Sequence, residues 1–549
     1  MGVVHVEDRE AFVGIAPDEK SLGDNVSEYV CQFLDSARRN ERDEKCMSLK
    51  QGLSMFPKAV MWSLVVSSAI MMEGYDTNLM NSLYGFPAFA KKYGEYYEAS
   101  LRYEIPAKWQ TSINMAINVG TLLGLSVSGW LIGKWGNKKV MLAALVVLVG
   151  FIFVLFFAVS IQMLLVSMIL LGFPLGTFQA ISTALAVEFC PMVLRVYLTS
   201  WINVCWTIGQ LILSGVLRGF VNGDSELSFK VPFAIQWVWP VPIFVAVLFC
   251  PESPWWLVKN GRLEEAEKSL LRLISIQESH KRHLADAMVK KIQMTLKEEE
   301  ASANDTYVDC FRGPNSRRTR ISACTWMFQN LSGSALIGYS SYFYIQAGLS
   351  TDNAYTFSII QYILGILGTL TSWVVSQRYG RFQIYSYGLV FLFLLLMTIG
   401  GIACSSNENA PWAIGSLLLV YTYCYNTSIG PLTYTIVAEI PSTVLRVKTI
   451  IIARNTYNIA GIFTSLINPY MLNPSAWNWG AKLGFFWGGF ALLAFTWSYF
   501  DLPETKDRTF YEIDYLFNNN VPARKFKSCQ IDAPAAQQYL DNPPTKLNT

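Results

Sequence analysis

Residues 59–76 decide the fold: the apolar run AVMWSLVVSSAIMM passes directly into Glu73-Gly74-Tyr75-Asp76. The run predicts a membrane-spanning helix. One Asp at the centre of such a helix costs about 3 kcal/mol on insertion scales, so two acids three residues apart on one helical face need a polar cavity or a partner. We therefore expect a proton or substrate path at Glu73 and Asp76. The alternative places both at the helix end, among lipid headgroups.

The composition is that of a membrane protein. The chain has 549 residues, of which 52% are hydrophobic and only 15% are charged. A soluble protein of this length would carry far more charge. The net charge of +3 is too small to indicate nucleic-acid binding. Ten cysteines are scattered without CxxC pairs, so we expect neither a disulfide framework nor a metal site.

Apolar runs long enough to cross a bilayer recur along the chain. They predict an all-α polytopic membrane protein with twelve spanning helices, six on each side of a polar segment. The runs lie at 59–84, 107–132, 140–159, 162–186, 197–217 and 232–250, and then at 321–346, 354–376, 383–404, 411–437, 449–472 and 482–500.

Polar segments divide the chain further. We expect an N-terminal tail (1–57), a six-helix half (58–250), a loop with short helices (251–318), a second six-helix half (319–502) and a C-terminal tail (503–549). In the loop, GRLEEAEKSLLRLI repeats apolar residues such as Leu263 and Leu270 at helical spacing, which predicts an amphipathic helix. Thr509 and Glu512 have the spacing of a capping box, which predicts a short helix in the tail.

The basic loops predict the orientation in the bilayer. The connections VSIQ, STDNA and SSNENAPW carry no Lys or Arg. Because Lys and Arg concentrate in cytoplasmic loops, we expect both termini in the cytoplasm. The connections on that side hold Lys134, Lys138, Lys139, Arg195, Arg378, Arg381, Arg446 and Lys448.

The two predicted halves repeat each other in sequence. Glu188 and Arg195 bracket FCPMVL, and Glu439 and Arg446 bracket IPSTVL at the same separation. PES at 251–253 and PET at 503–505 follow the sixth and twelfth runs in nearly the same register. A tandem pair of six-helix units, with a binding site at the midplane between them, describes the major facilitator fold.

Several motifs carry a resemblance to a known family. PESPWWLVKNGRLEEA resembles the PESPRWL signature of the sugar porter family, and PETKDRTFYEIDYLF resembles its PETKG ending. The segments EGYDTNL, FAIQWVWP, STDNAYTFSIIQYILGI, IIARNTYNI, WNWGAKLGFFWGGF and VPARKFKS resemble the fungal maltose and α-glucoside permeases, and the likeness covers about residues 50–530. The resemblance implies a proton symporter that imports α-glucosides across the plasma membrane as a monomer, with no cofactor.

The resemblance also implies which residues couple transport to protons. Asp76 matches the acid that takes up and releases the proton in sugar porters, and Glu73 is the second acid of EGYD. Arg454, inside the eleventh run, is the expected cationic partner, and static pairing that holds the bundle is the alternative. In two places the chain departs from the family. Helix four lacks an Arg before Gly172, and Thr121 stands where the permeases have an acid in helix two.

Sugar binding is expected from amides and aromatic rings, which pair with hydroxyls and pack on pyranose faces. Any one of these polar residues could instead bond a neighbouring helix. Matching the family pattern, the expected residues are Asn203 and Gln210 in helix five, Gln329, Asn330 and Tyr339 in helix seven, Tyr434 in helix ten and Asn458 in helix eleven.

The duplicated charges match a cytoplasmic gate in the family. There the acids, here Glu188 and Glu439, form salt bridges to the basic loop after helix two or eight. The first-half loop is weakened to GKWGNK, whereas the second half keeps two arginines. The expected gate residues are Glu188, Arg195, Arg378, Arg381, Glu439 and Arg446.

Two other functions compete with the symporter. The missing helix-two acid suggests a facilitator that moves sugar without protons. A non-transporting sugar sensor would carry a long signalling tail, and only 47 residues follow Leu502. An enzyme is not expected, because the chain has no phosphate-binding G-x-x-x-x-G-K-[ST] loop and its three histidines lie in polar segments.

Overall fold

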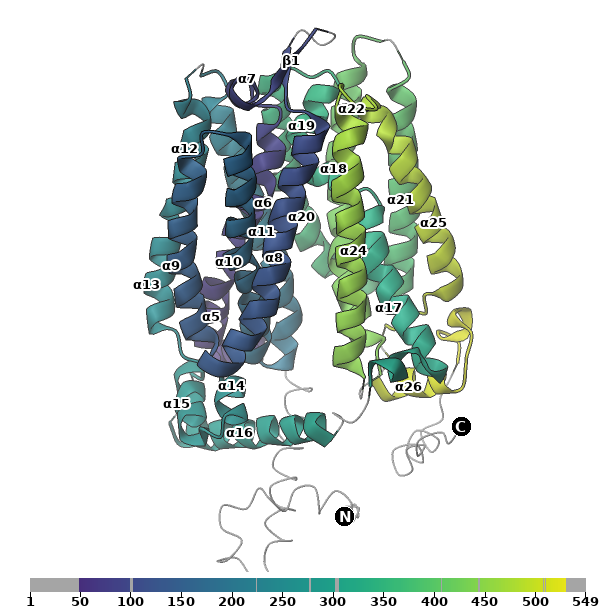
Figure 1. Cartoon of the computed structure of the whole chain (residues 1–549). Helices are drawn as coiled ribbons and strands as arrows, with labels where there is room; N and C mark the ends of the chain where they lie inside the picture. Colours follow the sequence, from purple (N-terminus) through teal and green to yellow (C-terminus); the bar gives the residue numbers. More distant parts are fainter. Residues whose placement is uncertain are drawn as a thin grey trace, which may run out of the picture.

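The helices run side by side in two groups, one from each half of the sequence (Figure 1). The computed structural model describes residues 49–98, 102–223, 225–275, 278–301, 306–405, 407–442, 445–506, 508 and 510–529. Of the expected N-terminal tail, residues 1–48 lie outside this description. The end of the expected tail contains helix α4 (Leu49–Met55), whose Gly52 lies against Leu194 of the fifth spanning helix. The boundary at residue 57 stays a prediction.

The first group holds six spanning elements. They are α5 (Pro57–Ser67) with α6 (Ala69–Leu83), α8 (Ala107–Trp135), α9 (Asn137–Phe156), α10 (Ile161–Glu188), α11 (Met192–Phe220), and α12 (Leu227–Ile235) continued by η3 (Gln236–Val238) and α13 (Pro240–Phe249).

The second group repeats this number. Its elements are α17 (Gly313–Leu331) with α18 (Ala335–Gly338) and α19 (Ser340–Gln346), α20 (Thr351–Arg378), α21 (Arg381–Ile402), α22 (Ala410–Thr427) with α23 (Ile429–Glu439), α24 (Arg446–Leu472), and η6 (Gly480–Lys482) with α25 (Leu483–Asp501). The predicted all-α architecture of two six-helix halves is confirmed.

Nine stretches of the described chain are long and apolar enough to span a membrane. Three further spans are interrupted. The first passes from α5 to α6 through Ser68, which keeps helical dihedral angles. The seventh unwinds at Gly333, whose φ of 101° suits glycine. The tenth is divided at Ser428, between α22 and α23. Such breaks place irregular backbone where it is enclosed by protein, as in other transporters.

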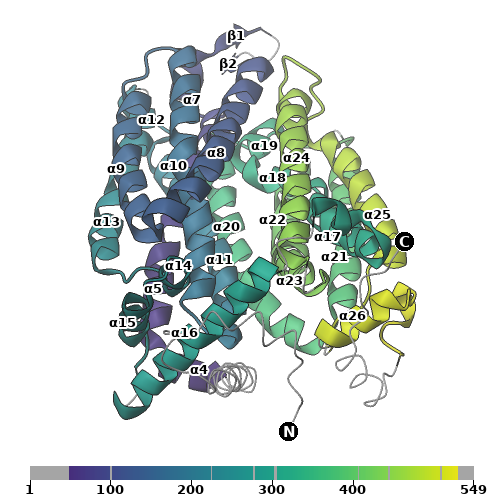
Figure 2. The same ribbon diagram turned by 60° about the horizontal axis from the view of Figure 1, so that its bottom comes forward.

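Short elements cover the two ends of the bundle. At one end, called the hairpin end, α7 (Pro87–Tyr93) precedes an antiparallel pair, β1 (Glu95–Tyr97) with β2 (Arg102–Glu104), in which Tyr96 faces Tyr103. At the other, called the loop-helix end, lie α14 (Pro254–Lys259), α15 (Leu263–Leu273), α16 (Glu278–Ala301), η5 (Tyr307–Phe311), α26 (Phe510–Asn518) and η7 (Ala523–Lys525) (Figure 2).

The predicted loop helices are present as α15 and α26, although Thr509 of the expected capping box lies outside the described residues. Helix α17 starts at Gly313, six residues before the second half was expected to begin. The arginines in the first turns of α17 lower the hydropathy there, so the apolar pattern did not predict the start of this helix. Arg318 is nevertheless buried, because it forms an ion pair with Asp514 of α26.

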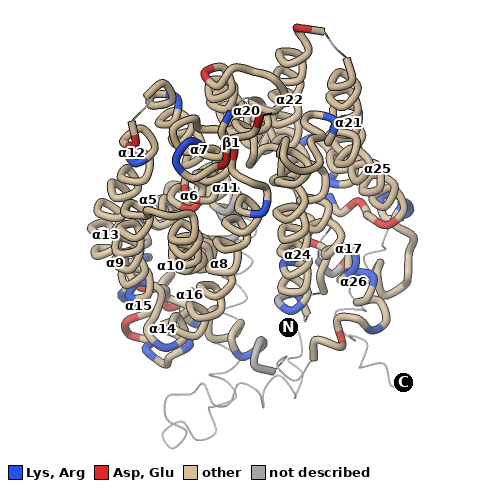
Figure 3. The backbone as a smooth tube through the Cα atoms, turned by 45° about the horizontal axis from the view of Figure 1, so that its top comes forward, with Lys and Arg blue, Asp and Glu red and all other residues tan. Residues whose placement is uncertain are grey.

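Charged residues gather at the two ends of the bundle and leave its middle almost bare (Figure 3). This distribution is expected of helices whose middle lies in hydrocarbon. The few charges in the middle therefore stand out as functional candidates. Glu73, Asp76 and Arg454 are among them.

Candidate functional site

The acids of the first span lie where α6 crosses α11 closely. A Cβ added to Gly74 would come within 2.0 Å of the Trp206 carbonyl oxygen, and one added to Gly209 within 2.1 Å of the Met71 carbonyl oxygen. Backbones can approach this far only where neither helix presents a side chain. The glycine of EGYD thus sets the positions of Glu73 and Asp76 on either side of the crossing.

Glu73 lies beside α10 of its own half. Its side chain is 9% exposed, and its Oε1 accepts a hydrogen bond from the Gln179 amide of α10 at 3.3 Å. It also interacts electrostatically with Arg454 of α24. These two described side chains form no ion pair within 4 Å, so the acid–arginine partnership between the halves stays a prediction.

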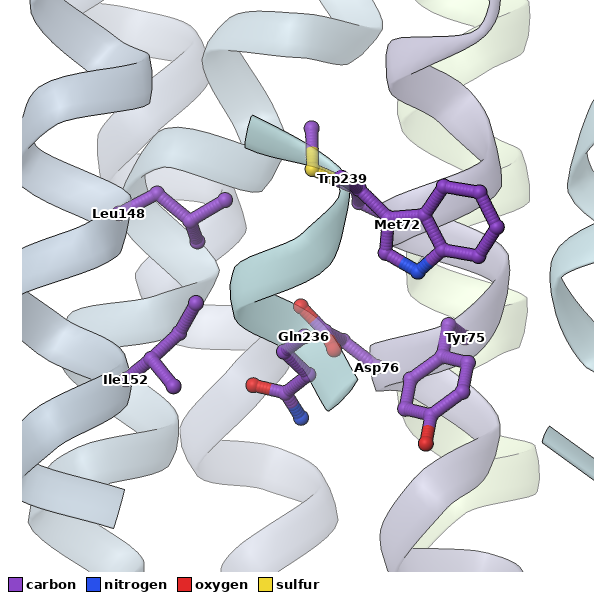
Figure 4. A pocket seen from close by; sticks show the side chains of 7 residues that line it. All are labelled: Met72, Tyr75, Asp76, Leu148, Ile152, Gln236 and Trp239. Carbon is purple, nitrogen blue, oxygen red and sulfur yellow. The ribbon is translucent and has the colours of Figure 1, made fainter. Parts of the chain in front are cut away.

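Asp76 faces the interior of the first half. It lines a small pocket with Leu148 and Ile152 of α9 and with Gln236 and Trp239 of the sixth span (Figure 4). The charged residue that acts on it is Glu73 of its own helix. Both acids lie on the same side of α6, but three residues turn a helix by about 300° and leave the two side chains about 60° apart, so they meet different neighbours.

Arg454 is enclosed by aromatic rings. Its guanidinium carbon lies 4.5 Å from the ring centroid of Tyr457 and 5.5 Å from that of Trp326. Trp326 in turn meets Tyr434 edge to face at 6.0 Å between centroids. Cation–π contacts of this kind hold a guanidinium where water is scarce. Of these rings, Trp326 is buried, whereas Tyr434 is 45% exposed.

The two amides before the break in the seventh span bond neighbouring helices. Gln329 donates to the Gly430 carbonyl at 2.8 Å, and Asn330 donates to the Tyr457 carbonyl at 3.0 Å. The Gln329 Oε1 is buried and has no partner among the described residues. That oxygen is free to accept a hydrogen bond from a ligand. With Tyr434 and Arg454, these residues form one cluster on α17, α23 and α24.

The structure does not bring all the expected sugar contacts into this cluster. Tyr339 instead accepts a hydrogen bond from Asn114 of α8, which places it in a contact between the halves. Gln210 is buried and Asn203 half-buried, both on α11, and Asn458 is half-buried on α24. A single cavity lined by Asn203, Gln210, Gln329, Asn330 and Tyr434 stays a prediction.

The two halves are fastened to each other at the hairpin end. Arg102 of β2 donates to Gln346 at 2.8 Å, and Asn473, after α24, donates to the Ile105 carbonyl at 2.8 Å. The Tyr355 hydroxyl donates to the Ser82 carbonyl at 2.7 Å. At the loop-helix end the Trp373 indole donates to Ser200 at 3.0 Å. The described bonds between halves are thus concentrated at the hairpin end.

The expected gate charges occupy equivalent places in the two halves. Glu439 pairs with Arg381 at 2.9 Å and accepts a bond from Thr505 at 2.5 Å, while Glu188 accepts one from Ser253. Because Ser253 and Thr505 belong to the repeated PES and PET motifs, the duplication holds in three dimensions.

In each half, the glutamate of the PES or PET motif accepts a hydrogen bond from the backbone just after the second spanning helix of that half. The Arg381 amide donates to Glu504 at 2.7 Å, as the Lys138 amide donates to Glu252 at 3.2 Å. Burial raises the pKa of Glu252 above its ordinary value, opposed by hydrogen bonds from backbone amides. Arg378 is exposed and Arg446 half-buried. The side chain of Arg195 lies outside the description.

The sequence did not indicate four residues that lie beside the buried charges Glu73, Asp76 and Arg454. Gln179, Gln236, Trp326 and Tyr457 are polar or aromatic residues inside apolar runs, and that was their signal. Each contacts or lies beside one of the three central charges. Periodicity could not show which charge each would meet, because the contacts join different helices.

The chain resembles known transport proteins along most of its length. The family model described as "Sugar (and other) transporter" matches residues 62–517. The general alpha-glucoside permease of Saccharomyces cerevisiae is 45% identical over 91% of this chain and 81% of its own. A maltose permease of the same organism is 44% identical over 96% of this chain and 87% of its own.

Solved structures show the same fold. The xylose transporter XylE of E. coli in a partially occluded inward open conformation superposes with a TM-score of 0.66, at 17% identity, covering 82% of this chain and 100% of that one. The proton:xylose symporter XylE bound to 6-bromo-6-deoxy-D-glucose also has a TM-score of 0.66, at 19% identity over 84% of this chain and 99% of that one.

Proposed function

The chain belongs to the sugar transporter family, so it is a multi-pass membrane transporter and not an enzyme, and from that premise we propose that it imports α-glucosides together with protons across the plasma membrane. The substrate class is supported by the similarity to α-glucoside and maltose permeases along most of both chains. Alternating access by rocking of the two halves would carry the sugar across.

The observation that carries proton coupling is the burial of two carboxylates in the first spanning helix. Glu73 is 9% exposed and Asp76 3%, and neither forms an ion pair within 4 Å among the described residues. A buried carboxylate without a close cation is stabilised by protonation. Because Glu73 and Arg454 lie on opposite halves, movement of the halves would change their interaction and with it the charge of Glu73.

The cluster of Gln329, Asn330, Tyr434 and Arg454 is the sugar site we propose on the second half, with Asn203 and Gln210 facing it from the first. The unpartnered Gln329 oxygen would accept a sugar hydroxyl, and the Tyr434 ring, which is 45% exposed, would lie under a pyranose face. Closure at the hairpin end fits a state open toward the loop-helix end. We place that end and both termini in the cytoplasm.

The test combines sugar uptake with proton movement. Cells that lack other permeases would express wild type, Asp76→Asn or Glu73→Gln, and receive labelled maltose. Wild type should alkalinise the medium and concentrate sugar, whereas a variant of the coupling acid should lose concentration but keep exchange of sugar down its gradient. Concentrative uptake by both variants would refute the coupling role of these acids.

A facilitator is the second candidate, and Thr121 favours it. Threonine is not an acid, and the Thr121 hydroxyl donates to the Ile117 carbonyl of its own helix at 2.9 Å. Helix two therefore contributes no proton carrier at this position. Uptake in wild type that never exceeds the external concentration, with no proton movement, would establish the facilitator. A panel of maltose, maltotriose, sucrose, isomaltose and trehalose in the same cells would define the substrate range.

A further inference from the structure

Asp76 and Gln236 are two buried polar residues that line the same pocket. Each is 3% exposed. The Oδ1 atom of Asp76, both amide atoms of Gln236 and the Trp239 indole nitrogen have no hydrogen-bond partner among the described residues. Unpaired buried polar groups are rare and costly. Here four such atoms border one pocket.

The pocket leaves Asp76 few other groups to meet. Its remaining wall is made of Leu148 and Ile152 of α9 and of Met72 and Tyr75 of α6. The Tyr75 hydroxyl is already used, since it donates to the Pro232 carbonyl at 2.8 Å. The charged group that acts on Asp76 is Glu73, an acid, which cannot stabilise a carboxylate. Figure 4 shows Gln236 and Trp239 beside Asp76 as the polar side chains of this space.

The backbone holds Gln236 at a break in the sixth span. Pro232 lies inside α12 and Pro240 begins α13, and between them residues Gln236–Val238 form a 3₁₀ turn. Short 3₁₀ segments inside helices often mark functional hinges. The bond from Tyr75 to Pro232 ties this break to the helix that carries Asp76. The amide is thereby kept opposite the carboxyl.

No hydrogen bond joins Asp76 and Gln236 in this structure. We propose that rotation of the Gln236 side chain within the pocket makes it the hydrogen-bond partner of Asp76 in both of its protonation states. This inference rests on the proton coupling proposed above. The ionised carboxylate accepts a hydrogen from the amide Nε2. When Asp76 takes up a proton, its new O–H donates to the amide Oε1 after the amide rotates. An amide can serve both states because it carries a donor and an acceptor, whereas a guanidinium only donates.

The proposed cycle adds one proton to Asp76 and later removes it. One proton enters from solution and resides on the carboxyl oxygen, and the same proton leaves when the carboxylate is restored. Gln236 neither gains nor loses a proton, so it is a positioning residue. It holds the carboxyl in one orientation and lowers the cost of the charged state in a helix that offers no cation there.

The test is Gln236→Met, which keeps the length of the side chain and removes its hydrogen bonds. Purified protein in liposomes is examined by difference infrared spectroscopy, and the carbonyl band of the protonated acid is identified by its loss in Asp76→Asn. In Gln236→Met this band should move to higher frequency, because the acid loses its partner. Ile152→Leu, which changes the same pocket without changing its polarity, should leave the band in place.

Transport supplies a second measurement on the same liposomes. Net maltose uptake driven by a proton gradient should fall about tenfold in Gln236→Met, the loss expected when a bond to a charged group is removed. Exchange of maltose at equal concentrations should stay unchanged, since it requires no release of the proton. A variant that merely disturbed folding would lose both activities.

An unshifted band or an undiminished net uptake in Gln236→Met would overturn the proposal. Should that variant not fold, Gln236→Asn keeps the amide but shortens its reach, and the band should shift in the same direction. If wild type moves maltose without protons, the proposed symport fails, and the infrared band still decides whether Gln236 and Asp76 are paired.

Discussion

Gly74→Ala should destabilise the protein and move both acids of the first span. The added Cβ would lie 2.0 Å from the Trp206 carbonyl oxygen, so α6 and α11 would have to separate by about 1.4 Å to reach ordinary contact at 3.4 Å. The obstacle is backbone and cannot rotate away. Overpacking costs about 1–3 kcal/mol even where side chains can adjust, and we expect the upper end here.

Gly150→Ala is the matched control. Gly150 lies in α9, and nothing lies within 4 Å of an added Cβ. There the alanine should instead stabilise its helix by about 0.5–1 kcal/mol. The two variants make the same chemical change in spanning helices of the same half, so the gain in helix propensity cancels. The difference between them, about 1–3 kcal/mol, isolates the crossing of α6 and α11.

Thermal stability in detergent, followed by size-exclusion chromatography of a fluorescent fusion, would measure the difference. Gly74→Ala should melt several degrees below wild type. In a large domain, each kcal/mol of lost stability lowers the melting temperature by about 2–4 °C. The variant should also lose concentrative uptake, because Glu73 and Asp76 are displaced. Equal melting temperatures for Gly74→Ala and Gly150→Ala would refute the close crossing.

Three further variants test other contacts. Arg318→Met leaves the carboxylate of Asp514 unpaired near a buried site and should cost about 3–5 kcal/mol of stability. Arg320→Met changes a side chain that is 58% exposed and should cost less than about 1 kcal/mol. Thermal melting of the two variants compares these losses. Arg381→Ala breaks the ion pair with Glu439 and should slow transport with a small loss of stability; an uptake rate equal to that of wild type would contradict the gate. Tyr339→Phe removes the bond to Asn114 and should increase labelling of a cysteine introduced at the hairpin end, and unchanged labelling would show that this bond does not hold the halves together.

The sequence alone was sufficient for the fold and the transport class. Apolar runs of spanning length predicted twelve helices, because a bilayer leaves few other ways to satisfy the backbone. The repeated charges around 188 and 439 predicted two equivalent halves, and PES and PET now bond those charges in both. Spans with interruptions were still recognised, since hydropathy does not depend on an unbroken helix.

Hydropathy was less informative where polar side chains are buried by specific partners. The start of α17 was placed too late, because Arg318 reads as a loop residue until Asp514 is known to meet it. Likewise, the family pattern at Tyr339 does not reveal that its hydroxyl accepts a bond from Asn114 across the halves. A sequence pattern gives the residue type and its helix, and the neighbouring helix determines which of its possible bonds forms.

Only the tertiary structure shows that Glu73 and Asp76 have different surroundings. Both acids could be predicted as functional from their cost in a spanning helix. Only the packing of α6 against α11 decides that Glu73 meets Gln179 and the field of Arg454, while Asp76 turns toward Gln236. The physical reason is that side chains about 60° apart on one helix meet different neighbours, and which neighbours lie there is set by segments more than a hundred residues away.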